Sequence, residues 1–446
     1  APASVDIGGF DVWVAGVQGD GVVTVGASGT LQTNANGTFT GAISGAGGVL
    51  VGAFTQTMTG CNNTYAGPTS IAGGTLSTDC LADGLQASGI GASDASSTNL
   101  VIDNGALVYT GGDIGIDRGA QLSRTAQINV SNAATTLELE GVLTGTGLLS
   151  KQGAGTLVLS NTNSYSGGTL VYGGTLRPLS AGALGTGGVR MGLAGTRLDL
   201  SAVAGSAISV AWIDDSATNA NAASVGDIDL GATNLTITPG GSALGVGGSA
   251  NYAGVISGTG GVIKAGGSVQ QFSGCNNTYT GATTISGGVL AVDCLADGSA
   301  FSSIGASTAD AASLILDGGT LRYVGTGHTT DRLFTLGAST TSAIDASGTG
   351  AIVFSNTAPI AFGSPNTAQT VTLTGVSTAD NELGLQLTDN GTGKTGLSKT
   401  GVGTWILTNP GSTYTGVTSI TGGVLGVDKL TDGGTASSLR QSSNLA

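Results

Sequence analysis

Apolar and polar residues alternate over short stretches along most of the chain. Runs such as Gly21-Val-Val-Thr-Val25 and Leu137-Glu-Leu-Glu-Gly-Val-Leu143 are separated by turns rich in Gly. An alternation with a period of two residues predicts half-buried β-strands. Helical periodicity is missing from the sequence, and each interior Gly would cost a helix about 1 kcal/mol. The pattern therefore predicts an all-β fold.

One stretch of this pattern, from Cys275 to Gly298, occurs four times. A nearly identical copy runs from Cys61 to Gly84, two diverged copies surround Tyr165 and Tyr414, and a Gly-Gly pair follows the Tyr in every copy. The similarity of the first and third copies extends without insertion over residues 61–118 and 275–332. Such self-similarity is typical of a solenoid, in which each coil buries its apolar face on its neighbours. Coils of about 20 residues are expected.

The repeats predict one domain, a single elongated parallel β-helix with Val, Leu and Ile inside and Thr, Ser and Asn outside. Residues 1–46 match the repeats poorly and are expected to form an N-terminal cap or the first coils, whereas residues 47–446 form the solenoid repeats. The last repeat stops midway, so the chain is expected to be a fragment of a longer protein. Its first residues, Ala-Pro-Ala-Ser, are typical of a chain from which a signal peptide has been removed.

The negative charge of the chain disfavours two classes of binding partner. The formal net charge is −14, and only 13 residues are Lys or Arg. Binding to nucleic acid or to an anionic membrane surface needs a basic patch, so neither partner is expected. The sequence contains no apolar run of the length that spans a bilayer, and no membrane-spanning segment or cofactor is predicted.

The four Cys form two pairs with equal spacing, 61 with 80 and 275 with 294. In the diverged copies both Cys are replaced together, by Asn161 and Ser180 in one copy and by Pro410 and Lys429 in the other. Joint loss is what a covalent bond between the two positions predicts. We therefore expect the disulfides Cys61–Cys80 and Cys275–Cys294, each joining one coil to the next, in an oxidising compartment. A zinc site would need Cys-x-x-Cys or His partners nearby, which the sequence does not show.

Three motifs recur in a fixed order, namely Gly-x-Gly-Thr-Leu, Tyr-x-Gly-x-Thr and Gly-Gly-x-Leu. Residues 153–176 and 401–425 show this order best. The set resembles the autotransporter-associated β-strand repeat of type V secreted passenger regions. The resemblance implies a right-handed parallel β-helix at the cell surface or secreted, and an outer-membrane β-barrel translocator, missing from this chain, as a partner. It further implies contacts with a host surface, matrix or other cells, and leaves self-association open.

Few residues offer catalytic chemistry. His328 is the only His, and the repeat places it opposite Ile114, so it is not expected to be a general base. The sequence also contains no Gly-x-Ser-x-Gly motif for a serine hydrolase. The pairs Asp117-Arg118 and Asp331-Arg332 recur in both copies, and we expect each to form a structural ion pair or a turn.

The acidic residues of the polar stretch 211–229 are the remaining candidates, and they are Asp214, Asp215, Asp227 and Asp229. They are the only residues that offer the paired acids of a polysaccharide-cleaving enzyme, and they lack the spacing of a Ca²⁺ loop. We expect this stretch to be a solvated loop that leaves the solenoid. The sequence therefore favours a structural stalk or adhesin without catalytic residues, metal or enzymatic activity, and a polysaccharide-active β-helix enzyme is the alternative.

Overall fold

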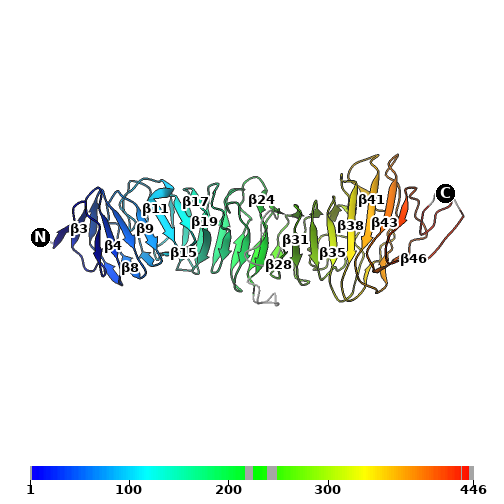
Figure 1. Cartoon of the computed structure of the whole chain (residues 1–446), viewed down its shortest axis with the longest axis horizontal. Helices are drawn as coiled ribbons and strands as arrows, with labels where there is room; N and C mark the ends of the chain where they lie inside the picture. The colour runs from blue at the N-terminus through cyan, green and yellow to red at the C-terminus, as the bar shows by residue number, and fades with distance from the viewer. Residues whose placement is uncertain (1–2, 216–224, 239–248, 433, 441–446) are drawn as a thin grey trace. The chain divides into compact units, whose positions relative to one another are not determined.

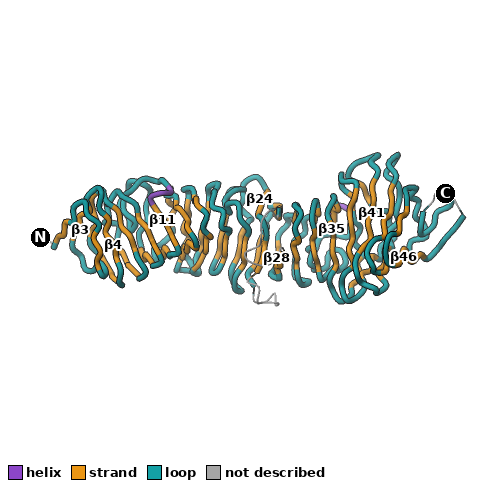
Figure 2. The backbone as a smooth tube through the Cα atoms, viewed as in Figure 1, coloured by secondary structure: helices purple, strands orange, loops and turns teal. Residues whose placement is uncertain are grey.

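The structure, a computed structural model, describes residues 3–215, 225–238, 249–432 and 434–440. The chain divides into two compact units, of which unit 1 comprises residues 1–210 and 225–227, and unit 2 comprises residues 211–224 and 228–446. Strands and loops alternate through both units (Figure 1), and the helical residues among those described are short 3₁₀ turns such as η1 (Ser97–Asn99) and η3 (Ala311–Ser313) (Figure 2). Each unit is a β-solenoid of parallel sheets, which confirms the predicted fold class; the right hand of the helix stays a prediction.

Unit 1 is built from parallel sheets whose neighbouring strands belong to successive coils. A short sheet contains β1 (Ser4–Asp6), β3 (Val22–Val25) and β6 (Ala42–Gly45). The second sheet contains β2 (Val12–Val14), β4 (Thr30–Thr33), β7 (Gly48–Val51), β9 (Thr69–Ala72), β11 (Leu100–Asp103), β14 (Ala120–Ser123) and β17 (Leu143–Gly145). The third sheet contains β5 (Gly37–Phe39), β8 (Thr55–Met58), β10 (Thr75–Thr78), β12 (Ala106–Tyr109), β15 (Thr125–Val130), β18 (Leu148–Gln152), β20 (Thr169–Val171) and β22 (Val189–Met191). The fourth sheet contains β13 (Ile114–Ile116), β16 (Thr136–Leu139), β19 (Thr156–Leu159), β21 (Thr175–Pro178) and β23 (Arg197–Asp199), and β24 (Ala207–Val210) follows.

Unit 2 has the same architecture. It begins with β25 (Ile213–Asp215), and β26 (Asp227–Asp229) pairs with β29 (Ile256–Ser257). One sheet contains β27 (Asn234–Ile237), β30 (Val262–Lys264), β32 (Thr283–Ile285), β34 (Leu314–Leu316), β37 (Thr335–Leu336) and β40 (Ala361–Phe362). The next contains β28 (Ser249–Tyr252), β31 (Val269–Phe272), β33 (Val289–Val292), β35 (Thr320–Tyr323), β38 (Thr341–Ala346), β41 (Gln369–Thr374), β43 (Thr395–Lys399) and β45 (Thr418–Ile420). The last contains β36 (His328–Thr330), β39 (Ile352–Phe354), β42 (Asn381–Leu383), β44 (Thr404–Leu407) and β46 (Val424–Val427).

The core consists of columns of aliphatic side chains that run from coil to coil. In the fourth sheet of unit 1, Leu137, Leu157, Leu176 and Leu198 are in register, and each is at most 1% exposed. Such a column forms because alternate residues of a strand point inward and parallel strands place equivalent residues side by side. The alternation in the sequence is therefore the inward and outward alternation of the coils.

Coil length varies more than the expected value of about 20 residues. Thr55 pairs with Thr75, 20 residues later, but Thr75 pairs with Ala106, 31 residues later. Unit 2 repeats this step, since Val289 pairs with Thr320, again 31 residues later. The long coils contain the segments after the second Cys of each pair. Sequence spacing alone did not show these longer coils, because the added residues resemble the turns around them.

The two repeat copies in each unit use different sheets. In unit 1 the first copy pairs β7 with β9 and β8 with β10, whereas the second pairs β18 with β20 and β19 with β21. Strands β8, β10, β18 and β20 share one sheet, so the second copy is shifted by one sheet around the coil. In unit 2 the copies at β30–β33 and β43–β46 show the same shift. The same order of sheets thus recurs in both units.

The described parts of residues 211–229 contain strands where a solvated loop was predicted. Asp227 and Asp229 lie in strand β26, where Asp227 is exposed, as predicted, and Asp229 is partly exposed. Asp214 and Asp215 lie in strand β25, and each is 4% exposed. The backbone N–H of Ala253 donates to Asp215 at 2.9 Å, which helps to satisfy a buried carboxylate. Residues 216–224 lie outside the described residues. The polar composition predicted exposure, but the neighbouring coil supplies partners that no local pattern reveals.

Candidate functional site

The Cys residues lie where neighbouring coils turn out of the same sheet. The structure joins Cys61 to Cys80 with Cα atoms 5.4 Å apart, and Cys275 to Cys294 with Cα atoms 5.3 Å apart. The strands that precede the two Cys of the first pair are neighbours, because Met58 pairs with Thr78. Each bond therefore links one coil to the next, in the arrangement that the spacing predicts. In both pairs the first Cys is exposed and the second is buried.

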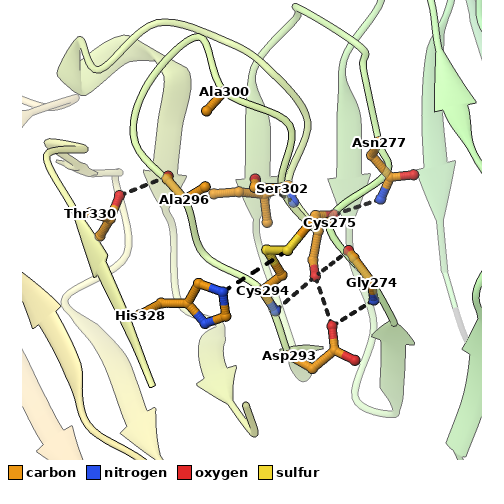
Figure 3. The surroundings of a disulfide bond; sticks show 12 residues. Gly274, Cys275, Asn277, Asp293, Cys294, Ala296, Ala300, Ser302, His328 and Thr330 are labelled. Carbon is orange, nitrogen blue, oxygen red and sulfur yellow. Dashed lines mark hydrogen bonds between the residues drawn. A yellow bond between two sulfur atoms is a disulfide. The ribbon is translucent and has the colours of Figure 1, made fainter. Parts of the chain in front are cut away.

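His328 lies against the second disulfide (Figure 3). Its Nε2 is 4.0 Å from the Sγ of Cys275, although the two residues are 53 positions apart in sequence. The sequence-based argument that no His is near the Cys pair is therefore wrong. Strand β36 begins at His328 on the sheet next to the one that carries the Cys pair, and the long coil brings its imidazole back to the disulfide. The equivalent residue beside the first disulfide is Ile114, which cannot donate a hydrogen bond.

The second ring nitrogen of His328 is held by Tyr323. The Tyr323 hydroxyl lies 2.7 Å from Nδ1, and the backbone N–H of Gly327 donates to the same hydroxyl at 2.7 Å. The hydroxyl therefore fixes the orientation of the imidazole through Nδ1, and Nε2 faces Cys275. When Nδ1 accepts the hydroxyl proton, Nε2 carries the ring proton. In the first copy the matching Tyr109 donates to the carbonyl of Gly112 instead. Tyr323 thus bonds to a side chain, whereas the matching Tyr109 bonds to a backbone carbonyl.

Cys275, Cys294 and His328 also form the one group with metal-ligand geometry that was found among the described residues. Their ligand atoms lie within 4.8 Å of one another. Both sulfurs are engaged in the disulfide, and a metal needs thiolates, so the oxidised protein presents only the imidazole as a ligand. The chemistry that this arrangement can support in its oxidised form is therefore that of a disulfide beside an imidazole nitrogen.

A buried Tyr–Thr pair marks the corner of every repeat copy. The hydroxyl groups of Tyr65 and Thr69 are 2.7 Å apart, and the matching distance for Tyr279 and Thr283 is again 2.7 Å. Burial raises the pKa of Tyr65 to about 12, and it raises the pKa of Tyr279 as well. These hydroxyls are consequently neutral donors that fix the corner. The Tyr-x-Gly-x-Thr motif therefore has a structural role.

The Gly residue of the recurring Ile-Gly-Ala-Ser segment packs on this corner. Gly91 has a φ of +75°, and a Cβ atom there would lie 2.6 Å from the Tyr65 ring. Gly305 repeats the geometry, with a φ of +78° and 2.4 Å from a Cβ to the carbonyl oxygen of Tyr279. Only Gly tolerates both the left-handed backbone and the close approach.

Asn63 and Asn277 cap the backbone of the adjacent coil. Asn63 accepts a hydrogen bond from the N–H of Ile43, and Asn277 accepts one from the N–H of Ile256. Both side chains are buried. Their role is therefore structural.

Three buried Lys interrupt the aliphatic columns, and sequence reasoning missed them. Lys264 is in register with Ile237 and Ile285, is fully buried, and donates to the carbonyls of Ala265, Gly266 and Gly287 at 2.7 to 3.1 Å. Lys151 and Lys399 make the same three contacts in the second and fourth copies. Burial lowers the pKa of Lys151 and of Lys264 to about 8. The sequence signal that could have revealed these buried Lys is their position two residues before a Gly-x-Gly or Gly-Gly motif, in a chain with few cations.

The repeated Asp-Arg pairs were expected to form an ion pair or a turn, and the contacts of Asp331 and Arg332 fit the second alternative, because both side chains bond to backbone groups of turns. Arg332 is fully buried and donates to the carbonyls of Ala296, Gly305 and Ser307 at 2.9 to 3.0 Å. The carboxylate of Asp331 accepts from the N–H of Gly298 at 2.7 Å. Each Arg therefore closes the long segment after the second Cys. A guanidinium has several N–H donors, so one Arg side chain can satisfy several turn carbonyls at once.

The chain is similar in sequence to known proteins. The passenger-associated-transport-repeat matches residues 52–77, 149–177, 262–292 and 397–427, which are the four copies described above. The chain is 50% identical over 448 aligned residues to the adhesin BmaC autotransporter of Brucella suis biovar 1 (strain 1330). That match covers 100% of this chain and 13% of the relative, so the chain spans about an eighth of the length of the relative. No solved structure matches the chain significantly.

No helix among the described residues is both long enough and apolar enough to cross a membrane.

Proposed function

The chain is a repeat-bearing region of an autotransporter passenger, and we propose from this premise that it acts as a structural stalk or adhesin. As a passenger region it is displayed at the cell surface or secreted. The observation that supports the proposal is the match over the whole chain to a protein named as an adhesin, together with four transport repeats. An outer-membrane translocator and a surface on host tissue, matrix or other cells are the proposed partners.

The buried network supports a scaffold role in this proposal. In each unit, successive coils are tied together by one disulfide, by a bond from the Thr of a Tyr–Thr corner to a backbone carbonyl of the next coil, and by buried Lys or Arg side chains. A surface of Thr, Ser and Asn on stacked strands offers many weak hydrogen-bonding groups, as an adhesive surface requires.

We also propose that the chain is not an enzyme. The imidazole of His328 is engaged by Tyr323 and faces a disulfide, and the carboxylates of Asp214 and Asp215 are buried. A polysaccharide-active enzyme would instead present two carboxylates to a groove. The alternative of a β-helix enzyme therefore gains no support from these residues.

Adherence of bacteria that display the chain tests the proposal. We expect a non-adherent strain that displays the chain on a translocator to bind matrix-coated or cell-coated surfaces more strongly than a strain that displays the translocator alone. The purified chain should compete for the same surface. Equal adherence of the two strains, or measurable turnover of polysaccharides by the purified chain, would contradict the proposal.

A further inference from the structure

The two disulfides of the chain offer an internal comparison. Residues 61–118 and 275–332 are aligned copies, and both Cys pairs have the same spacing and nearly the same Cα separation. The first Cys of each pair, Cys61 or Cys275, is exposed, and the second, Cys80 or Cys294, is buried. The neighbouring side chain differs, because Ile114 in one copy is His328 in the other. A difference in reactivity between the pairs can therefore be tested on that residue.

We propose that Cys275–Cys294 is a thiol-exchange site that accepts an external thiol on Cys275, whereas Cys61–Cys80 is an inert structural bond. The proposal rests on three observations at one place. Residue Cys275 is exposed, the Nε2 of His328 is 4.0 Å from its Sγ (Figure 3), and Tyr323 holds Nδ1 so that Nε2 faces the sulfur. It does not depend on the proposed adhesive function.

The exchange begins at the sulfur of the exposed residue Cys275. An external thiolate attacks the Sγ of Cys275, a new S–S bond forms between them, and the bond to Cys294 breaks. The electron pair of the broken bond leaves with the Sγ of Cys294 as a thiolate, which then takes up one proton from water. Cys294 is only 2% exposed, so attack on its sulfur is blocked and the mixed disulfide forms on Cys275.

A second thiolate completes the reaction. It attacks the sulfur of the attached group, the external thiols leave as their disulfide, and Cys275 is released as a thiolate. Two external thiols are thus oxidised while the protein disulfide is reduced to two thiols. The reductant is a thiol of low molecular weight or a protein thiol, and both use the same chemistry.

His328 accelerates the exchange because negative charge spreads over the three sulfurs in the transition state. The Nε2 of His328 lies 4.0 Å from the Sγ of Cys275, and the imidazole lies within 4.8 Å of both sulfurs. With a proton on Nε2, the imidazole donates to the sulfur and stabilises this charge and the thiolates that follow. The aliphatic side chain of Ile114 gives no such stabilisation. A difference of about tenfold in opening rate is expected from one hydrogen bond to a charged group.

Opening rates of the two disulfides in the full chain provide the test. The oxidised chain is incubated with reduced glutathione at constant pH without denaturant, free thiols are alkylated at intervals, and peptide mapping gives the open fraction of each pair. We expect Cys275–Cys294 to open about tenfold faster than Cys61–Cys80, with the glutathione adduct on Cys275. A peptide with a single Cys serves as a second arm, and its adduct distinguishes a protein thiol from a small thiol as the ligand. Equal opening of the pairs, or an adduct with neither probe, overturns the proposal.

Reciprocal variants separate the effect of His328 from local flexibility. His328→Ile should slow the opening of the second pair to the rate of the first, and Ile114→His should accelerate the first pair. Tyr323→Phe keeps the imidazole but removes its orienting partner, and it should slow the second pair even if His328→Ile fails to fold. An unchanged ratio of opening rates in the folded variants overturns the proposal.

Discussion

The hydroxyl of Ser180 donates a 2.9 Å hydrogen bond to the carbonyl oxygen of Asn161. These residues occupy the positions of Cys80 and Cys61 in the diverged copy, so a hydrogen bond between coils replaces the covalent link. The coils of this Cys-free copy are therefore held by more than packing alone. Two chemically different contacts thus join equivalent positions of the repeat.

This relationship predicts that a third disulfide can be introduced. The double variant Asn161→Cys/Ser180→Cys should form the new bond and stabilise its unit by about 3 kcal/mol, because a loop of this size loses conformational entropy in the unfolded chain. Non-reducing peptide mapping and urea unfolding measure the two effects. The single variant Ser180→Cys is the control. Persistent free thiols at 161 and 180 would show that the positions are not equivalent to the natural pairs.

The pairing of the natural Cys is itself testable. Peptide mapping without reduction should recover fragments linking Cys61 to Cys80 and Cys275 to Cys294. Replacing Cys61 and Cys80 together by Ser should lower the stability of unit 1 by about 3 kcal/mol, again because loop-closure entropy is lost. A Cys61–Cys275 link in the mapped fragments would contradict both the pairing and the alignment of the copies.

Much of the fold follows from the sequence, for reasons that particular residues make clear. Leu137 and Leu157 could be placed in the core because strand alternation and coil repetition are local signals. The Cys pairs could be assigned because both members are absent from the diverged copies. The contact of Cys275 with His328 could not be predicted, because it depends on how a 31-residue coil returns to the stack. The burial of Asp214 and Asp215 likewise depends on partners in another coil, and the local composition indicated a solvated loop.

Arg332 is expected to be far more important for stability than a typical surface cation. Arg332→Met removes the donors to three turn carbonyls in a fully buried site, and we expect a loss of about 3 kcal/mol or more. Arg322→Met is the matched control, because its ion pair with Asp345 is partly exposed and should contribute less than about 1 kcal/mol. Urea unfolding of both variants gives the comparison. Similar losses would mean that the carbonyls in the long segment find water instead.

The buried Lys264 predicts a defined dependence of stability on alkaline pH. Its pKa is lowered by burial from 10.5 to about 8, so between these values the unfolded chain binds more protons than the folded chain. The contribution of this side chain to stability is then greatest above pH 10.5, falls as the pH drops towards 8, and is constant below it. The stability difference between the wild type and Lys264→Met should therefore change by about 3 kcal/mol across this window, in favour of the wild type at high pH.

Urea unfolding of the two proteins at several pH values from 7 to 11 measures that difference, with replacement of the exposed Lys394 by Met as the surface control. Subtracting the variant removes the contribution of Tyr and other groups that titrate at high pH, because they are present in both proteins. A flat difference would mean that the three carbonyl acceptors keep the ammonium as stable as in water. Lys264 would then be a fully compensated buried charge, and its replacement by Met should destabilise unit 2 equally at every pH, because three carbonyls would lose their donor.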